Sequence, residues 1–410
     1  MIKVYFISLG CPKNLVDTEK IMGSMVQNGI SICDELEDCD AVVINTCGFI
    51  KPALKETEAE IQKILKHNKK IFVYGCAVNR AYKELAKKFP EINHWYPISE
   101  KNKLLEDILN KRKIKRGARL LTTYGYAYLK IADGCSNHCA YCTIPYIKGE
   151  FRSHKFEDLV EESRGLAELG IKEIILIAQD TANYGFDLYG KKMLVPLIRE
   201  ISKIKNIEWI RLLYVHPRSL DENLIAEIKG NPKVCKYLEI PIQHINDRIL
   251  KLMNRGIMKK EIIQKIKELK GITLRTTVIA GFPTETEEEF KELYDFLGSG
   301  YFDWFGVFKY YREEETPAAQ LECLPRTVVE RRFKMIVELQ QRLIKERNKL
   351  RINKFYKILI HKKNRDFIGH AEFSAPEIDG QVIVKRNDVE IGKFCRLKIA
   401  KFEGVDLYAY

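Results

Sequence analysis

Three cysteines stand close together in the middle of the chain with the spacing C-x3-C-x2-C. They are Cys135, Cys139 and Cys142, in a loop that follows a short predicted strand. Thiolates this close in one loop can converge on a metal centre, and soft thiolate ligands select zinc, copper(I) or iron–sulfur clusters. Three cysteines on a four-iron cluster leave one iron without a protein ligand. That iron could bind and reduce a small molecule.

A structural zinc site is the alternative for this loop, with His138 as the fourth ligand. Such a site would be closed and tetrahedral. Structural zinc sites usually pair two cysteine knuckles, and no second knuckle follows Cys142 in the sequence. The spacing therefore favours the cluster.

A second set of cysteines is spread over the first third of the chain. Cys11, Cys47 and Cys76 each lie just past a predicted strand, and helical segments separate them. Strand–helix alternation predicts a parallel sheet covered by helices, in which ligands sit beyond the carboxyl ends of the strands. The three thiols should emerge at one edge of the sheet, which suggests a second cluster. The alternative is that they are small buried hydrophobes. The strands are expected at 3–9, 41–46 and 71–74, and the helices at 15–28, 55–66, 80–89 and 101–109.

Bulk composition places limits on the class of protein. The chain has 410 residues, enough for two or three domains, and no apolar run near the roughly 20 residues that span a membrane. Eleven cysteines without a secretory signal favour metal or catalysis over disulfides, so we expect a cytoplasmic protein. The net charge of +13 fits contact with RNA or a ribonucleoprotein. An ordinary solvated basic surface would give the same charge.

The middle of the chain repeats strand and helix six times, which predicts an open, partial β/α barrel. Active residues of such barrels lie at the carboxyl ends of strands, where the Cys135 loop also lies. Polar groups follow other strands, although capping and turn chemistry would also explain each of them. Strands are expected at 127–132, 173–178, 209–215, 237–240, 273–279 and 304–310, and helices at 156–169, 194–201, 221–229, 259–269 and 287–297.

The last third begins with a basic helical stretch, residues 326–354, whose buried face should include Ile336, Leu339, Leu343 and Leu350. Short strands punctuated by glycines follow at 355–361, 380–384, 394–402 and 406–410, and predict a small β-barrel. A solvated basic stretch, 111–119, separates the first domain from the second. The expected architecture is an N-terminal parallel α/β domain (1–117), a central partial β/α barrel (118–350) and a small C-terminal β-barrel (351–410).

The three-cysteine loop, in this β/α context, resembles the radical S-adenosylmethionine (SAM) superfamily. The segment from Ser8 to Glu19 resembles the amino-terminal motif of the methylthiotransferases, and its Cys-Pro-Lys-Asn form is similar to the ribosomal-protein (RimO-type) branch. The last sixty residues resemble a TRAM domain. Further segments similar to the ribosomal-protein branch are 178–181, 240–244, 247–255 and 375–380.

This resemblance implies two [4Fe-4S] clusters and SAM as cofactors. One cluster, on Cys135, Cys139 and Cys142, would hold SAM at its open iron and cleave it to a 5′-deoxyadenosyl radical. The other, on Cys11, Cys47 and Cys76, would supply sulfur, and a second SAM the methyl group. No further catalytic residue is expected beyond the cluster ligands. Tyr141 matches the position that contacts adenine, and the other candidate SAM contacts are Gln179, Asp180, Arg211, Gln243 and Phe282.

For the ribosomal-protein branch, the implied substrate is the β-carbon of an aspartate in small-subunit ribosomal protein twelve, free or on the ribosome. A reductase or flavodoxin-type donor would supply electrons, ribosomal RNA could contact the basic surface, and no membrane is involved. One alternative is the same chemistry on an adenosine of transfer RNA. Another is a non-enzymatic iron–sulfur protein that binds RNA, which would leave two three-cysteine sets unexplained.

Overall fold

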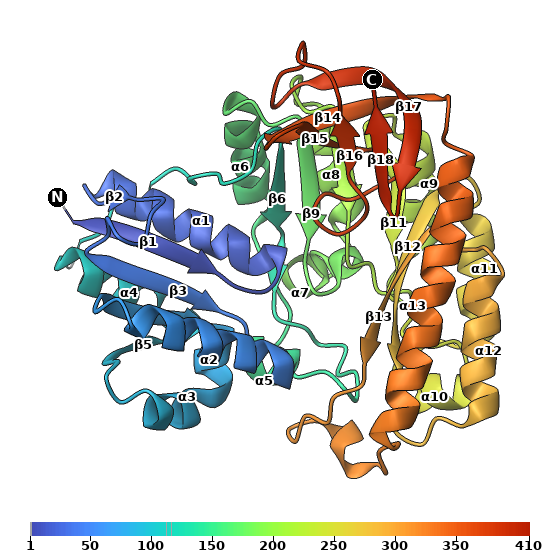
Figure 1. Ribbon diagram of the computed structural model, residues 1–410, viewed down its shortest axis with the longest axis horizontal. Coiled ribbons are helices and arrows are strands. Elements are labelled where there is room, and N and C mark those ends of the chain that lie inside the picture. The colour runs from blue at the N-terminus through green and yellow to red at the C-terminus, as the bar shows by residue number, and fades with distance from the viewer. Residues whose placement is uncertain (1, 112, 116) are drawn as a thin grey trace. The chain divides into compact units, whose positions relative to one another are not determined.

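The computed structural model describes residues 2–111, 113–115 and 117–410, which form two compact units (Figure 1). The first unit runs through Thr122 and also includes Gly134–Ser136 and Cys142–Glu150. The second unit comprises Thr123–Asp133, Asn137–Tyr141 and Phe151–Tyr410. The cysteine loop is therefore shared between the units. No helix among the described residues is long and apolar enough to cross a membrane.

The first unit is built on a parallel five-stranded sheet with the order β2-β1-β3-β4-β5. The three strands expected from the sequence are present, which confirms the parallel α/β prediction. The two edge strands were not predicted because they are only two and three residues long, too short to show a pattern. The strands are β1 (Lys3–Ser8), β2 (Ser31–Ile32), β3 (Ala41–Thr46), β4 (Lys70–Gly75) and β5 (His94–Tyr96).

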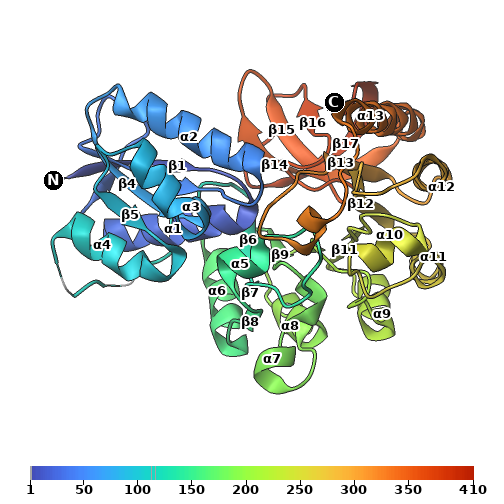
Figure 2. The same ribbon diagram turned by 90° about the horizontal axis from the view of Figure 1, so that it is seen from below.

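Helices cover both faces of this sheet because its central strands are apolar on both sides (Figure 2). Val43 and Phe72 pack with residues of α1 and α4, whereas Val42 and Val73 pack with residues of α2 and α3. Both α1 and α2 begin earlier than expected, with a proline in the first turn, where its missing N–H costs nothing. The helices are α1 (Pro12–Gln27), α2 (Lys51–Leu65), α3 (Cys76–Lys88) and α4 (Lys101–Leu109), with a 3-10 turn η1 (Ile98–Glu100).

The basic linker is not solvated throughout its length, contrary to the expectation. Arg119 donates from Nε to Glu19 Oε2 at 2.7 Å, and both side chains are buried. The backbone N–H and the hydroxyl of Thr122 donate to Glu19 Oε1 at 2.8 and 2.7 Å. A buried carboxylate on α1 thus fixes the end of the linker. Arg112 and Arg116 lie outside the described residues.

The second unit contains an open six-stranded parallel sheet with the order β13-β12-β11-β10-β9-β6, which confirms the partial β/α barrel. A two-stranded antiparallel ribbon, β7 with β8, follows the first of these strands. The strands are β6 (Tyr126–Lys130), β7 (Ala132–Asp133), β8 (Arg152–Ser153), β9 (Glu173–Ile177), β10 (Trp209–Leu212), β11 (Val234–Glu239), β12 (Thr273–Ala280) and β13 (Trp304–Lys309).

The five long helices predicted between these strands are all present within one or two residues of the expected bounds. They are α6 (Phe156–Glu168), α8 (Leu194–Ser202), α9 (Glu222–Gly230), α11 (Lys259–Glu268) and α12 (Glu287–Gly298). Shorter elements were not predicted because one or two turns carry no clear periodicity. They are α5 (Ile144–Lys148), which belongs to the first unit, α7 (Phe186–Tyr189), α10 (Asp247–Leu252), η2 (Thr181–Asn183) and η3 (Pro317–Gln320).

The long basic helix α13 (Arg326–Lys349) ends five residues before the expected position. Ile336 and Leu339 are buried as predicted, whereas Leu343 is only half-buried and its neighbour Ile344 is buried. Leu350 lies just past the helix end and is 64% exposed. Arg332 is not on the basic face. It is buried and donates to Glu285 Oε2 at 2.5 Å.

A closed five-stranded barrel ends the chain, as predicted, with the order β14-β15-β16-β18-β17. The sequence did not reveal β15, whose glycine and histidine interrupt the apolar pattern. The strands are β14 (Phe355–Lys363), β15 (Phe367–Ala371), β16 (Val382–Val384), β17 (Phe394–Glu403) and β18 (Asp406–Ala409).

A fully buried ionic network joins this small barrel to the β/α sheet. Arg211 on β10 donates to Glu173 on β9 at 2.6 Å and to the carbonyl oxygens of Glu372 and Ala371 at 2.8 and 3.3 Å. The other carboxylate oxygen of Glu173 contacts His370 on β15. Burial alone would raise the pKa of Glu173, but the charges of Arg211 and His370 outweigh burial and lower it to about 2.

Replacing this carboxylate should loosen the C-terminal barrel. Glu173→Gln leaves Arg211 buried without its counter-charge, which typically costs about 3–5 kcal/mol. Hydrogen exchange of the β14 and β15 amides should report that loss of local stability. Because the folded-state pKa of Glu173 lies below its usual value of 4.5, the stabilisation should be complete above pH 4.5 and disappear as the pH falls toward about 2.

The matched control for this experiment is Glu208→Gln. Glu208 pairs with Lys357 of β14 at 2.8 Å, but both side chains are more than a third exposed. An exposed pair contributes about 0–1 kcal/mol, so exchange should hardly change. Equal effects of the two substitutions would show that the buried network does not anchor the barrel.

Candidate functional site

The three N-terminal cysteines lie at one edge of the first sheet, as the sequence predicts. Cys11 precedes α1, Cys47 directly follows β3, and Cys76 is the first residue of α3, directly after β4. Strands β1, β3 and β4 are neighbours and parallel, so their carboxyl ends share that edge. That these thiols hold a cluster remains a prediction.

Asn14 ties the three strand ends together. Its side-chain amide donates to the carbonyl oxygens of Leu9 and Thr46, each at 3.0 Å, and its Oδ1 lies 3.7 Å from the Cys76 thiol as acceptor. The residue is only 2% exposed. One buried amide therefore fixes the turns that carry all three cysteines.

Burial makes two of these thiols, Cys47 and Cys76, hard to ionise on their own. Desolvation raises the pKa of Cys76 to about 12 and also raises the pKa of Cys47. The buried ammonium of Lys148, which belongs to the same unit, acts in the opposite direction on both. A metal centre supplies far more positive charge and deprotonates a coordinating thiol outright. The donor set therefore fits an iron–sulfur cluster.

Close packing within the first unit also fixes both ends of the central cysteine loop. Gly134 has φ +69°, and a Cβ there would lie 1.9 Å from the carbonyl oxygen of Glu150. The Cys135 amide donates to Gly149 O at 3.0 Å. At the other end, the hydroxyl of Thr143 donates to Phe49 O at 2.6 Å. Within the first unit, the residue that follows Cys142 thus contacts the turn that carries Cys47.

The side chains of the cysteine loop do not gather around one point in the part of the chain that the structure describes. No group of three or more histidine, cysteine, aspartate or glutamate side chains there could hold a metal ion. His138 is exposed, in a left-handed conformation with φ +47°. A cluster of several irons does not require its thiolates to converge on one ion, because each binds a different iron.

In the second unit, Cys139 is 9% exposed and accepts a hydrogen bond from Arg255 Nη1 at 3.2 Å. Arg255 is itself 3% exposed and also reaches the hydroxyl of Tyr141 at 3.3 Å and Pro241 O at 2.5 Å. A buried cation thus lies in direct hydrogen-bond contact with the sulfur of one cysteine of the loop.

A polar network at the carboxyl ends of β9 and β10 centres on Asp180. Its carboxylate accepts hydrogen bonds from Asn137 in the cysteine loop at 3.0 Å, from Ser219 at 2.5 Å and from the His216 amide at 3.3 Å. Burial raises the pKa of Asp180 although these bonds favour its charged form. Asp180 therefore connects the cysteine loop to two strand ends, which accounts for its position without a ligand.

The structure also places the other residues that the sequence suggests as SAM contacts. Tyr141 and Phe282 pack in one apolar cluster beside α10, and Gln243 has φ +69° at a bridge to β12. Gln179 is half-buried at the end of β9. Arg211 has a structural role that the other candidates lack, because its guanidinium is fully buried against Glu173 and the small barrel. Contact of any of them with SAM stays a sequence prediction.

Two residues important for this geometry were not singled out from the sequence. Asn14 was noted only as part of a motif, and Arg255 as the end of another. An asparagine in a first helical turn or an arginine after a short helix has many ordinary explanations. Thr46 and Cys76, which Asn14 contacts, and Cys139, which Arg255 contacts, are 32 or more residues away in the chain, so no local pattern could reveal these contacts.

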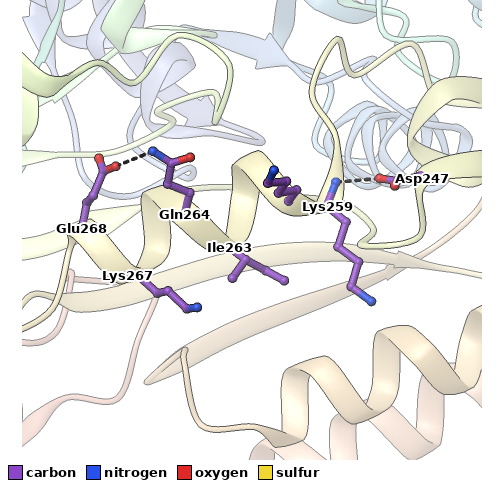
Figure 3. A pocket seen from close by; sticks show the side chains of 7 residues that line it. Asp247, Lys259, Ile263, Gln264, Lys267 and Glu268 are labelled. Carbon is purple, nitrogen blue, oxygen red and sulfur yellow. Dashed lines mark hydrogen bonds between the residues drawn. The ribbon is translucent and has the colours of Figure 1, made fainter.

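Figure 3 shows a shallow surface depression beside α11, unrelated to these sites. Its lining includes three lysine side chains and the aliphatic side chain of Ile263. Within it, Gln264 donates to Glu268 at 3.0 Å and the Lys259 amide donates to Asp247 at 2.6 Å. None of the candidate site residues lines it.

Family models match three consecutive parts of the chain. Residues 3–97 match the Uncharacterized protein family UPF0004, residues 129–297 the Radical SAM superfamily, and residues 352–410 the TRAM domain. Proteins named ribosomal protein uS12 methylthiotransferase RimO are similar over nearly the whole chain. The one from Caldicellulosiruptor saccharolyticus is 42% identical over 97% of both chains, and one from Clostridium perfringens is 44% identical over 99% of this chain and 97% of its own.

The chain belongs to the RimO methylthiotransferase family. A solved structure of the radical SAM methyltransferase TsrM from Kitasatospora setae shares the fold, with a TM-score of 0.59 at 14% identity, over 77% of this chain and 76% of that one. It contains cobalamin and a [4Fe-4S] cluster. These relatives and the family models confirm the enzyme class and the fold class expected from the sequence, and support iron–sulfur and SAM chemistry.

The close approach at Gly134 generates a prediction about cluster loading. Gly134→Ala adds a Cβ that collides with the Glu150 carbonyl, so the loop that carries Cys135 cannot close and the iron content should fall. Iron and sulfide analysis after anaerobic reconstitution measures the effect.

Gly190→Ala is the control, because Gly190 also has a positive φ, +67°, in the left-handed region, but nothing lies within 4 Å of its added Cβ. Both variants carry the roughly 1 kcal/mol cost of a left-handed alanine, and only the first carries the collision. Full iron loading of Gly134→Ala would refute this account of the loop.

Proposed function

We propose that this protein inserts a methylthio group at the β-carbon of an aspartate in ribosomal protein uS12. The observation that carries this proposal is the pair of three-cysteine sets, each fixed by buried contacts, in a chain of the RimO family. Two sets allow one protein to combine radical generation with sulfur donation. The transferred group, –SCH3, needs both.

In this proposal, Cys135, Cys139 and Cys142 hold a [4Fe-4S] cluster with an open iron for SAM, and Cys11, Cys47 and Cys76 hold a second one. When bound, these cofactors supply the deoxyadenosyl radical and the sulfur, which acid–base side chains cannot supply. The chain's own residues position the reactants. Burial of the Cys76 and Cys139 thiols excludes water from part of each set. Within the first unit, the hydroxyl of Thr143, next to Cys142, donates to Phe49 O near Cys47.

Tyr141, Gln179, Asp180, Gln243 and Phe282 remain the proposed surroundings of SAM. All five lie at the carboxyl ends of strands or in the cysteine loop, where β/α proteins bind ligands. The mixture of buried apolar rings and polar groups is typical of a small-molecule site.

We also propose two partners. Reductive cleavage of SAM consumes an electron, so a reductase or flavodoxin-type protein is required. Ribosomal RNA is a candidate for contact with the exposed basic side chains of α13, such as Arg326, Lys334, Arg342 and Lys345. Charge complementarity to phosphate supports this contact.

The first test is the intact mass of uS12 isolated from cells with and without the gene. Deletion should remove one methylthio group from the protein, and re-expression of the gene should restore it. An unchanged mass would refute the uS12 assignment. Loss of a methylthio nucleoside from transfer RNA would then establish the alternative substrate with the same chemistry.

Separate cysteine variants test the two-cluster proposal. Replacing Cys135, Cys139 and Cys142 by alanine should abolish SAM cleavage and leave about half of the iron, whereas replacing Cys11, Cys47 and Cys76 should preserve SAM cleavage and stop sulfur transfer. Iron analysis and detection of 5′-deoxyadenosine measure both effects. Complete retention or complete loss of iron in either variant would contradict two independent sites.

A further inference from the structure

The guanidinium of Arg255 is held in one position by three different groups. Nη1 donates to the Cys139 sulfur at 3.2 Å and to the Tyr141 hydroxyl at 3.3 Å, while Nη2 donates to Pro241 O at 2.5 Å. The side chain is 3% exposed, so water does not compete for these bonds. The three partners come from two segments: the cysteine loop supplies Cys139 and Tyr141, and the stretch after β11 supplies Pro241.

We propose that Arg255 is a positioning residue that raises the reduction potential of the cluster bound by Cys139. This inference rests on the proposed ligation of that cluster. It adds a residue to the reaction that the cysteine spacing and the family resemblance do not assign.

The physical argument concerns charge at a cluster sulfur. Reduction adds one negative charge, which spreads over the irons and their thiolates. A hydrogen bond to a ligand sulfur, and a nearby positive charge, stabilise the reduced form more than the oxidised form. The bond from Arg255 is charge-assisted and buried, and such bonds are stronger than neutral or exposed ones.

The anchoring of the guanidinium decides how large this effect is. A solvated arginine would be screened and would sample many rotamers, so its field at the sulfur would be weak. Here Pro241 O fixes the far side of the guanidinium, and Met253 O accepts the Ala140 amide at 3.0 Å, which holds the loop against the segment that carries Arg255. The Arg255 guanidinium therefore keeps its position relative to the Cys139 sulfur.

Arg248 offers a matched comparison on the neighbouring helix α10. It is an arginine of the same segment, but it is half exposed and pairs with Glu289 at 2.6 Å rather than with a cysteine. Its charge is neutralised by that carboxylate. Replacing it should not alter the cluster.

The experiment is a potentiometric titration of the full chain after anaerobic reconstitution, with dithionite as reductant and EPR detection of the reduced cluster. Cys11, Cys47 and Cys76 are replaced by alanine so that one cluster is observed. In Arg255→Gln, the ratio of reduced to oxidised cluster at the wild-type midpoint should fall at least tenfold, a shift of about 59 mV for one electron. Arg255→Lys should show a smaller shift of the same sign, and Arg248→Gln none.

Equal midpoint potentials with and without the Arg255→Gln substitution would overturn the inference while leaving the proposed function intact. Absence of any cluster in the unsubstituted chain would instead refute the proposed ligation. If Arg255→Gln and Arg255→Lys fail to assemble a cluster, pulsed EPR of the reduced, 15N-arginine-labelled chain decides. A guanidinium nitrogen coupling is expected, and its absence would refute the contact.

Discussion

Parallel strands in a sheet end at the same edge, and both cysteine sets depend on that constraint. In the first unit it gathers three residues, Cys11, Cys47 and Cys76, that are far apart in the chain, because β1, β3 and β4 are neighbours. In the second unit it brings the cysteine loop, Asp180 and His216 to one rim. The hydrogen bonds between strands thus bring together groups that are far apart in the sequence.

Burial of cysteine side chains is the second feature that the two cysteine sets share. Cys76 and Cys139 are both removed from water, where an unbound thiolate would be unfavourable. Each has a buried cation nearby: the charge of Lys148 lowers the pKa of Cys76, against the effect of burial, and Arg255 donates a hydrogen bond to the Cys139 sulfur. Asn14 and Asp180 then fix the surrounding turns with hydrogen bonds rather than with apolar packing. Such polar networks specify one geometry because every unpaired donor would be costly.

The small C-terminal barrel is held by the same kind of buried polar contact. Arg211 and Glu173 pair within the β/α sheet and extend to His370 and to backbone carbonyls of the barrel. A second link joins Asp379 to Tyr237 at 2.7 Å and to Arg275 at 3.1 Å. Buried ion pairs of this type require exact partners, so they fix where the barrel docks more than they add to stability.

The sequence by itself determined the fold class, the six cluster cysteines as candidates and the family, because spacing and periodicity are local properties of the chain. It also located most long strands and helices. It could not show that Arg211 and Arg332 are buried in ion pairs, that Glu19 anchors the linker, or that Asn14 and Arg255 hold the cysteine turns. Those contacts join residues at least 32 positions apart. Only tertiary packing decides which charges lose their water and which partner replaces it.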